Sequence, residues 1–166
     1  KVADDHSKVS VMPVLWLGLM LAGPVVLVDN VSSEKEVPKT LGATLDPLMC
    51  NHFEKAFKNA KVQVKCRADI EAILKLRAMQ SAVGSPTQCT KDVEACAAQT
   101  AKLAHCTHVL VSNLNKDKSG YIMALSLVDT TGKVFESHKI SGASADALLK
   151  NLSSAVPKLV AALNKP

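Results

Sequence analysis

The stretch THVLVSNLNKDKSGYIMALSLVDTTGKVFESHKI, residues 107–140, decides the fold. It contains three runs of mainly β-branched and aliphatic residues, at 107–114, 121–128 and 134–140, separated by two polar turns that contain glycine. Such runs predict consecutive antiparallel strands joined by short connections. In the middle strand Tyr121, Met123, Leu125 and Leu127 share one face, and Ile122, Ala124, Ser126 and Val128 share the other. Both faces are largely apolar, so the meander needs partners to cover it.

Upstream of this meander, short strands alternate with helices. Strands are predicted at 25–28 and 62–64, and helical stripes at 38–59, 68–82 and 91–103, with a closing helix at 145–163. Ser33 to Glu36 carries the capping-box pattern for the first helix. Asp46-Pro47 inside that helix looks like a second N-terminus, which predicts a kink or two abutting helices.

The resulting order is β-α-β-α-α-β-β-β-α. It predicts an α/β fold, a single-domain sandwich with a mixed sheet of about five strands and helices packed on it. The first two strands are each followed by helices, so we expect them to be parallel, with crossovers on one face.

A charge-free run from Val11 to Val28 consists of two parts. Residues 12–22 have the length and apolar content of an export signal, whereas Val25–Val28 reads as the first strand. This predicts a leader segment over 1–24, cleaved after Ala22, and a single domain over 25–166. A membrane anchor retained over residues 11–24 and an ordinary buried segment are the alternatives. Acidic residues near the start are unusual for a leader, so it stays open whether residues 1–11 are native.

Composition narrows the class of partner. The chain is 48% hydrophobic and carries a net charge of +5 that is almost entirely lysine, with Arg67 and Arg77 as its two arginines. Nucleic-acid binding relies on arginine forks and stacking aromatics, and only 3% of the residues are aromatic. We therefore predict no nucleic-acid partner, and interpret the lysines mainly as a solvated surface.

Signatures of catalysis are missing from the sequence. The residues after the first strand, Asp29 to Ser33, include no glycine, so no phosphate-binding loop is predicted, and no G-x-S-x-G turn is present. His105, Cys106 and His108 could join Cys89 and Cys96 as metal ligands, but their spacing fits zinc poorly. A strand there would place Cys106 and His108 on one face. The sequence predicts no catalytic residue, no metal ligand and no cofactor.

Several strings carry a resemblance to a known family. They are VVLVD at 25–29, DIEAIL at 69–74, HVLVS at 108–112 and YIMALSLVD at 121–129. Over about residues 25–163 the chain resembles exported envelope proteins: the amino-terminal domain of the Tol-system translocation protein, the curli-secretion lipoprotein and the penicillin-binding-protein activator lipoproteins. The resemblance implies a non-enzymatic binding or assembly role in the Gram-negative periplasm or outer membrane. Unlike the lipoprotein members, this chain has no cysteine at the leader exit, Ala22-Gly23-Pro24.

The five cysteines are interpreted for an oxidising compartment. Cys89 and Cys96 bracket the start of the third helix, where the family resemblance also implies a cysteine pair, so we expect them to form a disulfide. A helix antiparallel to the strand that follows it could bring Cys50 near Cys66, a second pairing that stays open. Cys106 is then the candidate free thiol.

These observations predict an exported protein that acts by binding. It would be a scaffold or accessory subunit of a secretion, motility or cell-wall complex, with envelope proteins as partners in a homo- or hetero-oligomeric assembly. The alternatives are a module tethered to the membrane by an uncleaved leader and a cysteine-dependent redox or hydrolytic enzyme. An apolar sheet face left uncovered would be the docking surface, unless the helix at 145–163 packs on it.

Overall fold

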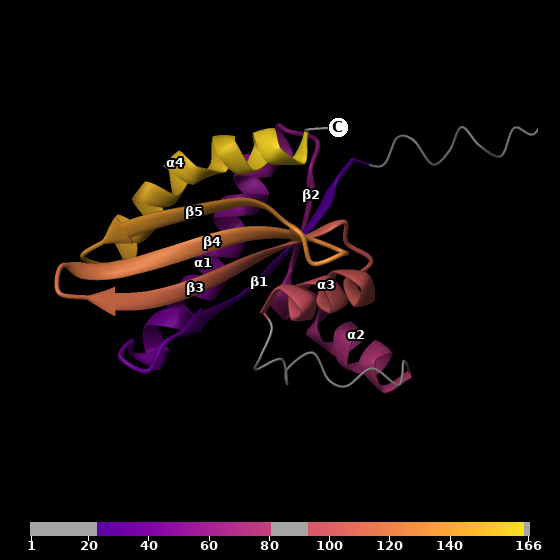
Figure 1. The fold of residues 1–166 in the computed structure, drawn as a ribbon, viewed down its shortest axis with the longest axis horizontal. Coiled ribbons are helices and arrows are strands. Elements are labelled where there is room, and N and C mark those ends of the chain that lie inside the picture. The colour runs from indigo at the N-terminus through magenta and orange to yellow at the C-terminus, as the bar shows by residue number, and fades with distance from the viewer. Residues whose placement is uncertain (1–22, 81–92, 165–166) are drawn as a thin grey trace, which may run out of the picture.

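The structure, a computed structural model, describes residues 23–80 and 93–164 (Figure 1). Its element order confirms the prediction: β1 Val25–Ser33, α1 Lys39–Lys58, β2 Gln63–Cys66, α2 Arg67–Gln80, α3 Val93–Ala104, β3 His108–Asp117, β4 Gly120–Asp129, β5 Val134–Gly142 and α4 Ala145–Leu163. Among the helices in these two ranges, none combines the length and apolar character needed to cross a membrane.

The strands form one mixed sheet with the order β2-β1-β3-β4-β5. β1 pairs in parallel with β2 on one side and with β3 on the other, and β3, β4 and β5 form the predicted antiparallel meander. The first strand of the chain therefore lies inside the sheet, and β2 and β5 are its edges.

The two crossovers lie on opposite faces of the sheet, so the expectation that they share one face is wrong. The β1-α1-β2 connection moves one position outward, and the β2-α2-α3-β3 connection moves back past β1. Parallel crossovers are almost always right-handed, and two right-handed crossovers that run in opposite directions must use opposite faces. As a result α1 and α2 leave neighbouring strands on different sides of the sheet.

Each face has its own hydrophobic core. On one face α1 and α4 bury the larger core, which includes Phe53, Phe57, Leu110 and Leu125. Since α4 packs beside α1, the alternative in which it covers the second face is also wrong. On the second face α2 and α3 gather at one end of the sheet (Figure 1), over a smaller core around Leu27.

The remaining part of the second face is only partly apolar. The alternation predicted for β4 is confirmed, because Met123, Leu125 and Leu127 are buried whereas Ile122, Ala124 and Ser126 are only partly so. The side chains that continue this surface onto β3 and β5 are small or polar: Asn113, Asn115, Ser137, Lys139 and Ser141. This face is therefore not the apolar patch that the sequence suggested.

The connection between β1 and α1 differs from its prediction. β1 continues past Asp29-Asn30 to Ser33, with a register shift between Val28 and Val31. Ser33 is thus a strand residue, and α1 begins after Pro38 without a side-chain cap. α1 also runs as one helix through Pro47, so of the two predicted alternatives the abutting helices are wrong, and a kink at Pro47 stays a prediction.

Candidate functional site

A pocket of about 350 Å³ opens where the pairing of β1 with β2 ends, at Val28 and Cys66. It lies between the register shift of β1, the end of β2, the middle of α1 and the first turns of α2, and its lining includes Asn30, Pro47, Asn51 and Ala68. In open α/β sheets a crevice forms where neighbouring parallel strands send their helices to opposite faces, and ligands bind there. The opposed crossovers of β1 and β2 produce this arrangement.

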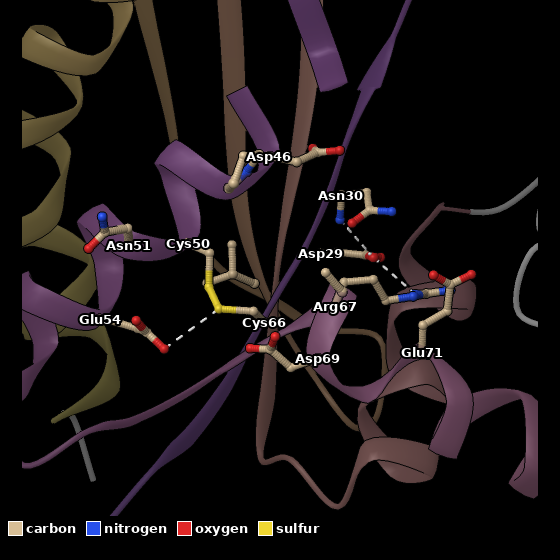
Figure 2. A pocket seen from close by; sticks show the side chains of 13 residues that line it. Asp29, Asn30, Asp46, Cys50, Asn51, Glu54, Cys66, Arg67, Asp69 and Glu71 are labelled. Atoms are coloured by element: carbon tan, nitrogen blue, oxygen red, sulfur yellow. Dashed lines mark hydrogen bonds and ion pairs between the residues drawn. A yellow bond between two sulfur atoms is a disulfide. The ribbon is translucent and has the colours of Figure 1, made fainter. Parts of the chain in front are cut away.

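The pocket is acidic although the chain is basic. Five carboxylates line it, together with a single arginine, Arg67: they belong to Asp29, Asp46, Glu54, Asp69 and Glu71. The whole chain carries a net charge of +5. Figure 2 shows Asp29 and Arg67 on one side of the pocket and the sulfur atoms of Cys50 and Cys66 on the other. Such a concentration of carboxylates in a concave surface attracts cations.

Asp29 and Arg67 link the register shift of β1 to the start of α2, directly after β2. The Arg67 guanidinium donates a hydrogen bond to Asp29 Oδ1 over 2.9 Å, and the two side chains are 10% and 24% exposed. Asp29 Oδ1 also accepts the backbone N–H of Asn30. Since a guanidinium this buried needs a partner, the pair fixes the first residue of α2 against the bulge in β1.

Asp46 projects from α1 toward the same bulge. Its Oδ1 accepts the backbone N–H of Val31 at 2.6 Å. Burial raises the pKa of this carboxyl above its ordinary value, the nearby Asp29 charge adds to the increase, and the hydrogen bond from Val31 opposes it. Asp46 therefore holds the strand in place at an electrostatic cost to its charged form.

Cys50 and Cys66 form a disulfide that joins α1 to the end of β2, with Cα atoms 5.8 Å apart. This is the second of the two pairings considered from the sequence. Glu54 lies one turn after Cys50, and its Oε1 is 3.7 Å from Cys66 Sγ (Figure 2). Together with the Asp29–Arg67 pair, the disulfide gives the pocket two fixed walls.

The other predicted site residues lie away from this pocket. Cys89 is outside the described residues, so its disulfide with Cys96 of α3 remains a prediction. Cys106 is a free, buried thiol. Burial raises the pKa of this thiol, and the nearby charge of Lys65 opposes part of the increase. The thiolate form is therefore scarce.

The structure does not bring the side chains of Cys106 and His108 together. Cys106 packs in the core on the α2–α3 side. His108 stands in register with Val26, a residue of the opposite core, and contacts the Phe135 ring. The expectation that Cys106 and His108 share a face is wrong because β3 begins only at His108, so strand alternation does not reach Cys106.

Sequence reasoning missed the pocket carboxylates. In the sequence Asp29 directly follows the first predicted strand, Asp46 fits the start of a helix, and nothing distinguishes Glu54 from other acidic residues. One signal was available, because polar residues directly follow each of the first two predicted strands. The ends of adjacent parallel strands meet at one edge of a sheet.

Comparisons with known proteins place the chain near several solved structures. No protein-family model matches it, and no curated protein does. The C-terminal domain of LpoB from Escherichia coli is 20% identical, with a TM-score of 0.48 over 73% of this chain and 84% of that one. Lipoprotein GNA1162 from Neisseria meningitidis is 21% identical, with a TM-score of 0.44 over 83% of this chain and 96% of the other.

TolB from Acinetobacter baumannii, to which the sequence resemblance pointed, also matches. It is 8% identical, with a TM-score of 0.46, and the match covers 84% of this chain but 28% of TolB. Likenesses at this level carry no information about a partner or an activity.

Proposed function

We propose that this protein is a non-enzymatic, extracytoplasmic binding module of the Gram-negative envelope, a scaffold or accessory subunit, and that it docks a basic segment of a partner protein in the acidic pocket. The observation that carries the proposal is the charge contrast: five carboxylates surround one arginine in a pocket of a chain with net charge +5. Arg67 is already paired with Asp29. Glu71 is paired with Lys75. Asp46, Glu54 and Asp69 remain without a cationic partner in the described residues, and they leave an excess of negative charge that a lysine or arginine side chain can complement.

The surface beside the pocket supports a polypeptide as the occupant. α2, whose first turns line the pocket, exposes three large apolar side chains farther along: Ile73 at 47%, Leu76 at 57% and Met79 at 80%. They are spaced three residues apart, so neighbouring pairs lie on adjacent turns of the helix. A segment with a basic residue followed by aliphatic residues could fill the pocket and cover this stripe.

Two observations support a location outside the cytoplasm. The Cys50–Cys66 disulfide is a type of bond that forms and persists in oxidising compartments. The leader predicted over residues 1–24 would bring the chain there; its residues 1–22 lie outside the described residues. Periplasm and outer membrane are both compatible with these observations.

Selection of short peptides displayed on phage against the immobilised, oxidised protein tests the docking proposal. We expect the enriched peptides to carry lysine or arginine beside aliphatic residues. Binding of such a peptide should fall with rising salt and by tenfold or more in Asp69→Lys, because that substitution places a repelling charge at the pocket. Asp146→Lys makes the same charge change in the first turn of α4 and serves as the matched control.

Enrichment of acidic peptides would exclude the pocket as the docking site. Equal binding of a basic peptide by wild type and Asp69→Lys would exclude it as well. If both variants lose binding equally, net charge rather than the pocket is responsible. That outcome would also overturn the proposal.

A further inference from the structure

The same pocket contains a second chemical feature, independent of the docking proposal. Cys50, Glu54 and Cys66 each offer one ligand atom, and these atoms all lie within 4.8 Å of one another. Within residues 23–80 and 93–164 this is the one group of three or more cysteine, histidine or acidic residues close enough to hold a metal ion.

The geometry of these atoms suits a thiophilic cation. Zinc binds thiolate sulfur at about 2.3 Å and carboxylate oxygen at about 2.0–2.2 Å, so tetrahedral ligand atoms lie roughly 3.5–3.8 Å apart. Glu54 Oε1 and Cys66 Sγ are 3.7 Å apart. Cys50 and Glu54 occupy positions i and i+4 of α1, which places both side chains on the helix face that meets the end of β2.

The placement of the Glu54 carboxylate is itself informative. Lys58 is its i+4 neighbour on α1 and would be a favourable ion-pair partner on an exposed helix face. In the described part of the chain Glu54 forms no ion pair, and its carboxylate instead points to the Cys66 sulfur (Figure 2). A disulfide sulfur has no proton to donate, so a hydrogen bond does not explain this placement.

We propose that Cys50, Cys66 and Glu54 form a zinc-class metal site when the disulfide is reduced, with the fourth coordination position open to the pocket. A dithiol reductant first transfers two electrons and two protons to the bridge, which gives two protein thiols and the disulfide of the reductant. The divalent ion then displaces both thiol protons and binds the two thiolates and Glu54. The sulfurs reach ligand spacing by rotation about their Cα–Cβ bonds.

The surroundings of the site are compatible with this ligand set. The pocket contains more carboxylates than cationic side chains, which favours a divalent cation there. Two thiolates and one carboxylate around a divalent ion leave one negative charge. Three protein ligands with an open fourth position are the arrangement of zinc sites that bind an exchangeable group. The metal form and the disulfide form are mutually exclusive, since both use the same two sulfurs.

Cobalt(II) is the probe for this site, because tetrahedral cobalt–thiolate centres absorb in the visible range and give a thiolate-to-metal charge-transfer band. The protein is a Cys89→Ser/Cys96→Ser/Cys106→Ala variant of the full chain, which removes the other thiols. After reduction we expect one cobalt per chain with both spectral features, and loss of both when zinc is added. The oxidised protein should give neither feature.

Substitutions identify the ligands. Glu54→Gln should weaken cobalt affinity by about tenfold or more. Mutation of a residue that only hydrogen-bonds to a metal ligand already has an effect of this size. Glu71→Gln removes another pocket carboxylate that is not in the ligand set and should change the affinity much less. Equal affinity in Glu54→Gln and the parent, or equal cobalt spectra in Cys50→Ser/Cys66→Ser, would overturn the proposal.

The rate of disulfide formation provides a second readout. It starts from freshly reduced protein and does not require the reduced form to persist. Zinc should slow air oxidation of the Cys50–Cys66 pair in the parent. The factor by which zinc slows oxidation should be at least several-fold smaller in Glu54→Gln. Oxidation that is unaffected by zinc in both proteins would also overturn the proposal. Because peptide docking is measured on the oxidised form, failure of the metal site leaves that test untouched.

Discussion

The carboxylate of Asp46, in the interior of α1, accepts the backbone N–H of Val31 in β1. Val31 lies where the pairing between β1 and β3 resumes after its register shift. A bulge leaves a backbone group without its regular ladder partner, and an unsatisfied N–H is costly when it is partly buried. A helix side chain thus completes the hydrogen bonding of an irregular strand, and Asp46 is positioned for that contact, not for capping.

Replacement of Asp46 separates its hydrogen bond from its charge. Asp46→Ala should lower the free energy of unfolding by about 1 kcal/mol, because the Val31 N–H loses its acceptor. Asp46→Asn keeps an acceptor oxygen and removes a charge that burial disfavours, so it should be at least as stable as wild type near neutral pH. Urea unfolding at constant ionic strength measures both effects. An Asn variant as unstable as the Ala variant would contradict this account.

The pH dependence of the same variants tests the raised pKa of Asp46. With a raised pKa the folded state binds a proton more tightly than the unfolded state, so this group makes stability fall as pH rises from its unfolded to its folded pKa. Asp46→Asn should therefore gain stability relative to wild type as the pH rises from about 4 toward 7. A difference that does not change with pH would show that the pKa is not raised.

Removal of Asp29 should be more damaging than removal of an exposed acid. Asp29→Ala leaves the buried Arg67 guanidinium without its partner, and we expect a loss of about 2 kcal/mol, less than for a fully buried pair because Asp29 is 24% exposed. Glu71→Ala is the control, since its i,i+4 pair with Lys75 is solvent-exposed and should matter little. Equal losses in both variants by urea unfolding would contradict the structural role of the Asp29–Arg67 pair.

The two cysteine pairs can be separated by their stability effects. In the chain-entropy model a bridge that spans 16 residues contributes about 3 kcal/mol, so Cys50→Ala/Cys66→Ala should lose roughly that amount. Cys106→Ala removes a thiol without removing a bridge and should lose less. If Cys89 and Cys96 are also bonded, a reductant should lower the melting temperature of Cys50→Ala/Cys66→Ala further. A melting temperature unchanged by reductant would argue against that second pair.

Export is tested by amino-terminal sequencing of protein purified from the envelope of its native host. We expect the mature chain to begin at Gly23 or close to it, because an apolar core ends there in a small residue before the first strand. Protein that retains residues 11–24 and fractionates with membranes would favour the anchored alternative instead. Expression with the leader deleted should leave the protein in the cytoplasm, which provides the control.

The sequence predicted the succession of elements well because that succession depends on local patterns. The alternation of Met123, Leu125 and Leu127 defined the inner face of β4, and the amphipathic stripe of residues 145–163 gave α4 its bounds. The positions of these elements relative to the sheet were harder to predict. The side of each crossover depends on the strand order β2-β1-β3, which no local pattern encodes.

The pocket depends on that same order. Asp29 and Arg67 are 38 residues apart, and they meet only because β1 and β2 are adjacent and parallel. The disulfide was easier to propose, since a helix followed by an antiparallel strand brings Cys50 and Cys66 back to the same end. The i,i+4 spacing places Glu54 on the same face of α1 as Cys50. Nothing in the sequence indicated that its carboxylate would point to Cys66 rather than pair with Lys58.

The position of β1 has a consequence for the order in which the molecule can assemble. β1 is synthesised before the other strands of this sheet, yet its partner β3 ends at Asp117. Until β3 has been made, β1 can pair only with the four residues of β2. The meander needs only local contacts, so it is expected to form early, with the amino-terminal strand inserted afterwards. The sheet therefore cannot be completed until β1 has paired with β3. Because β2 pairs only with β1, a truncation that removes β1 would separate β2 from the rest of the sheet.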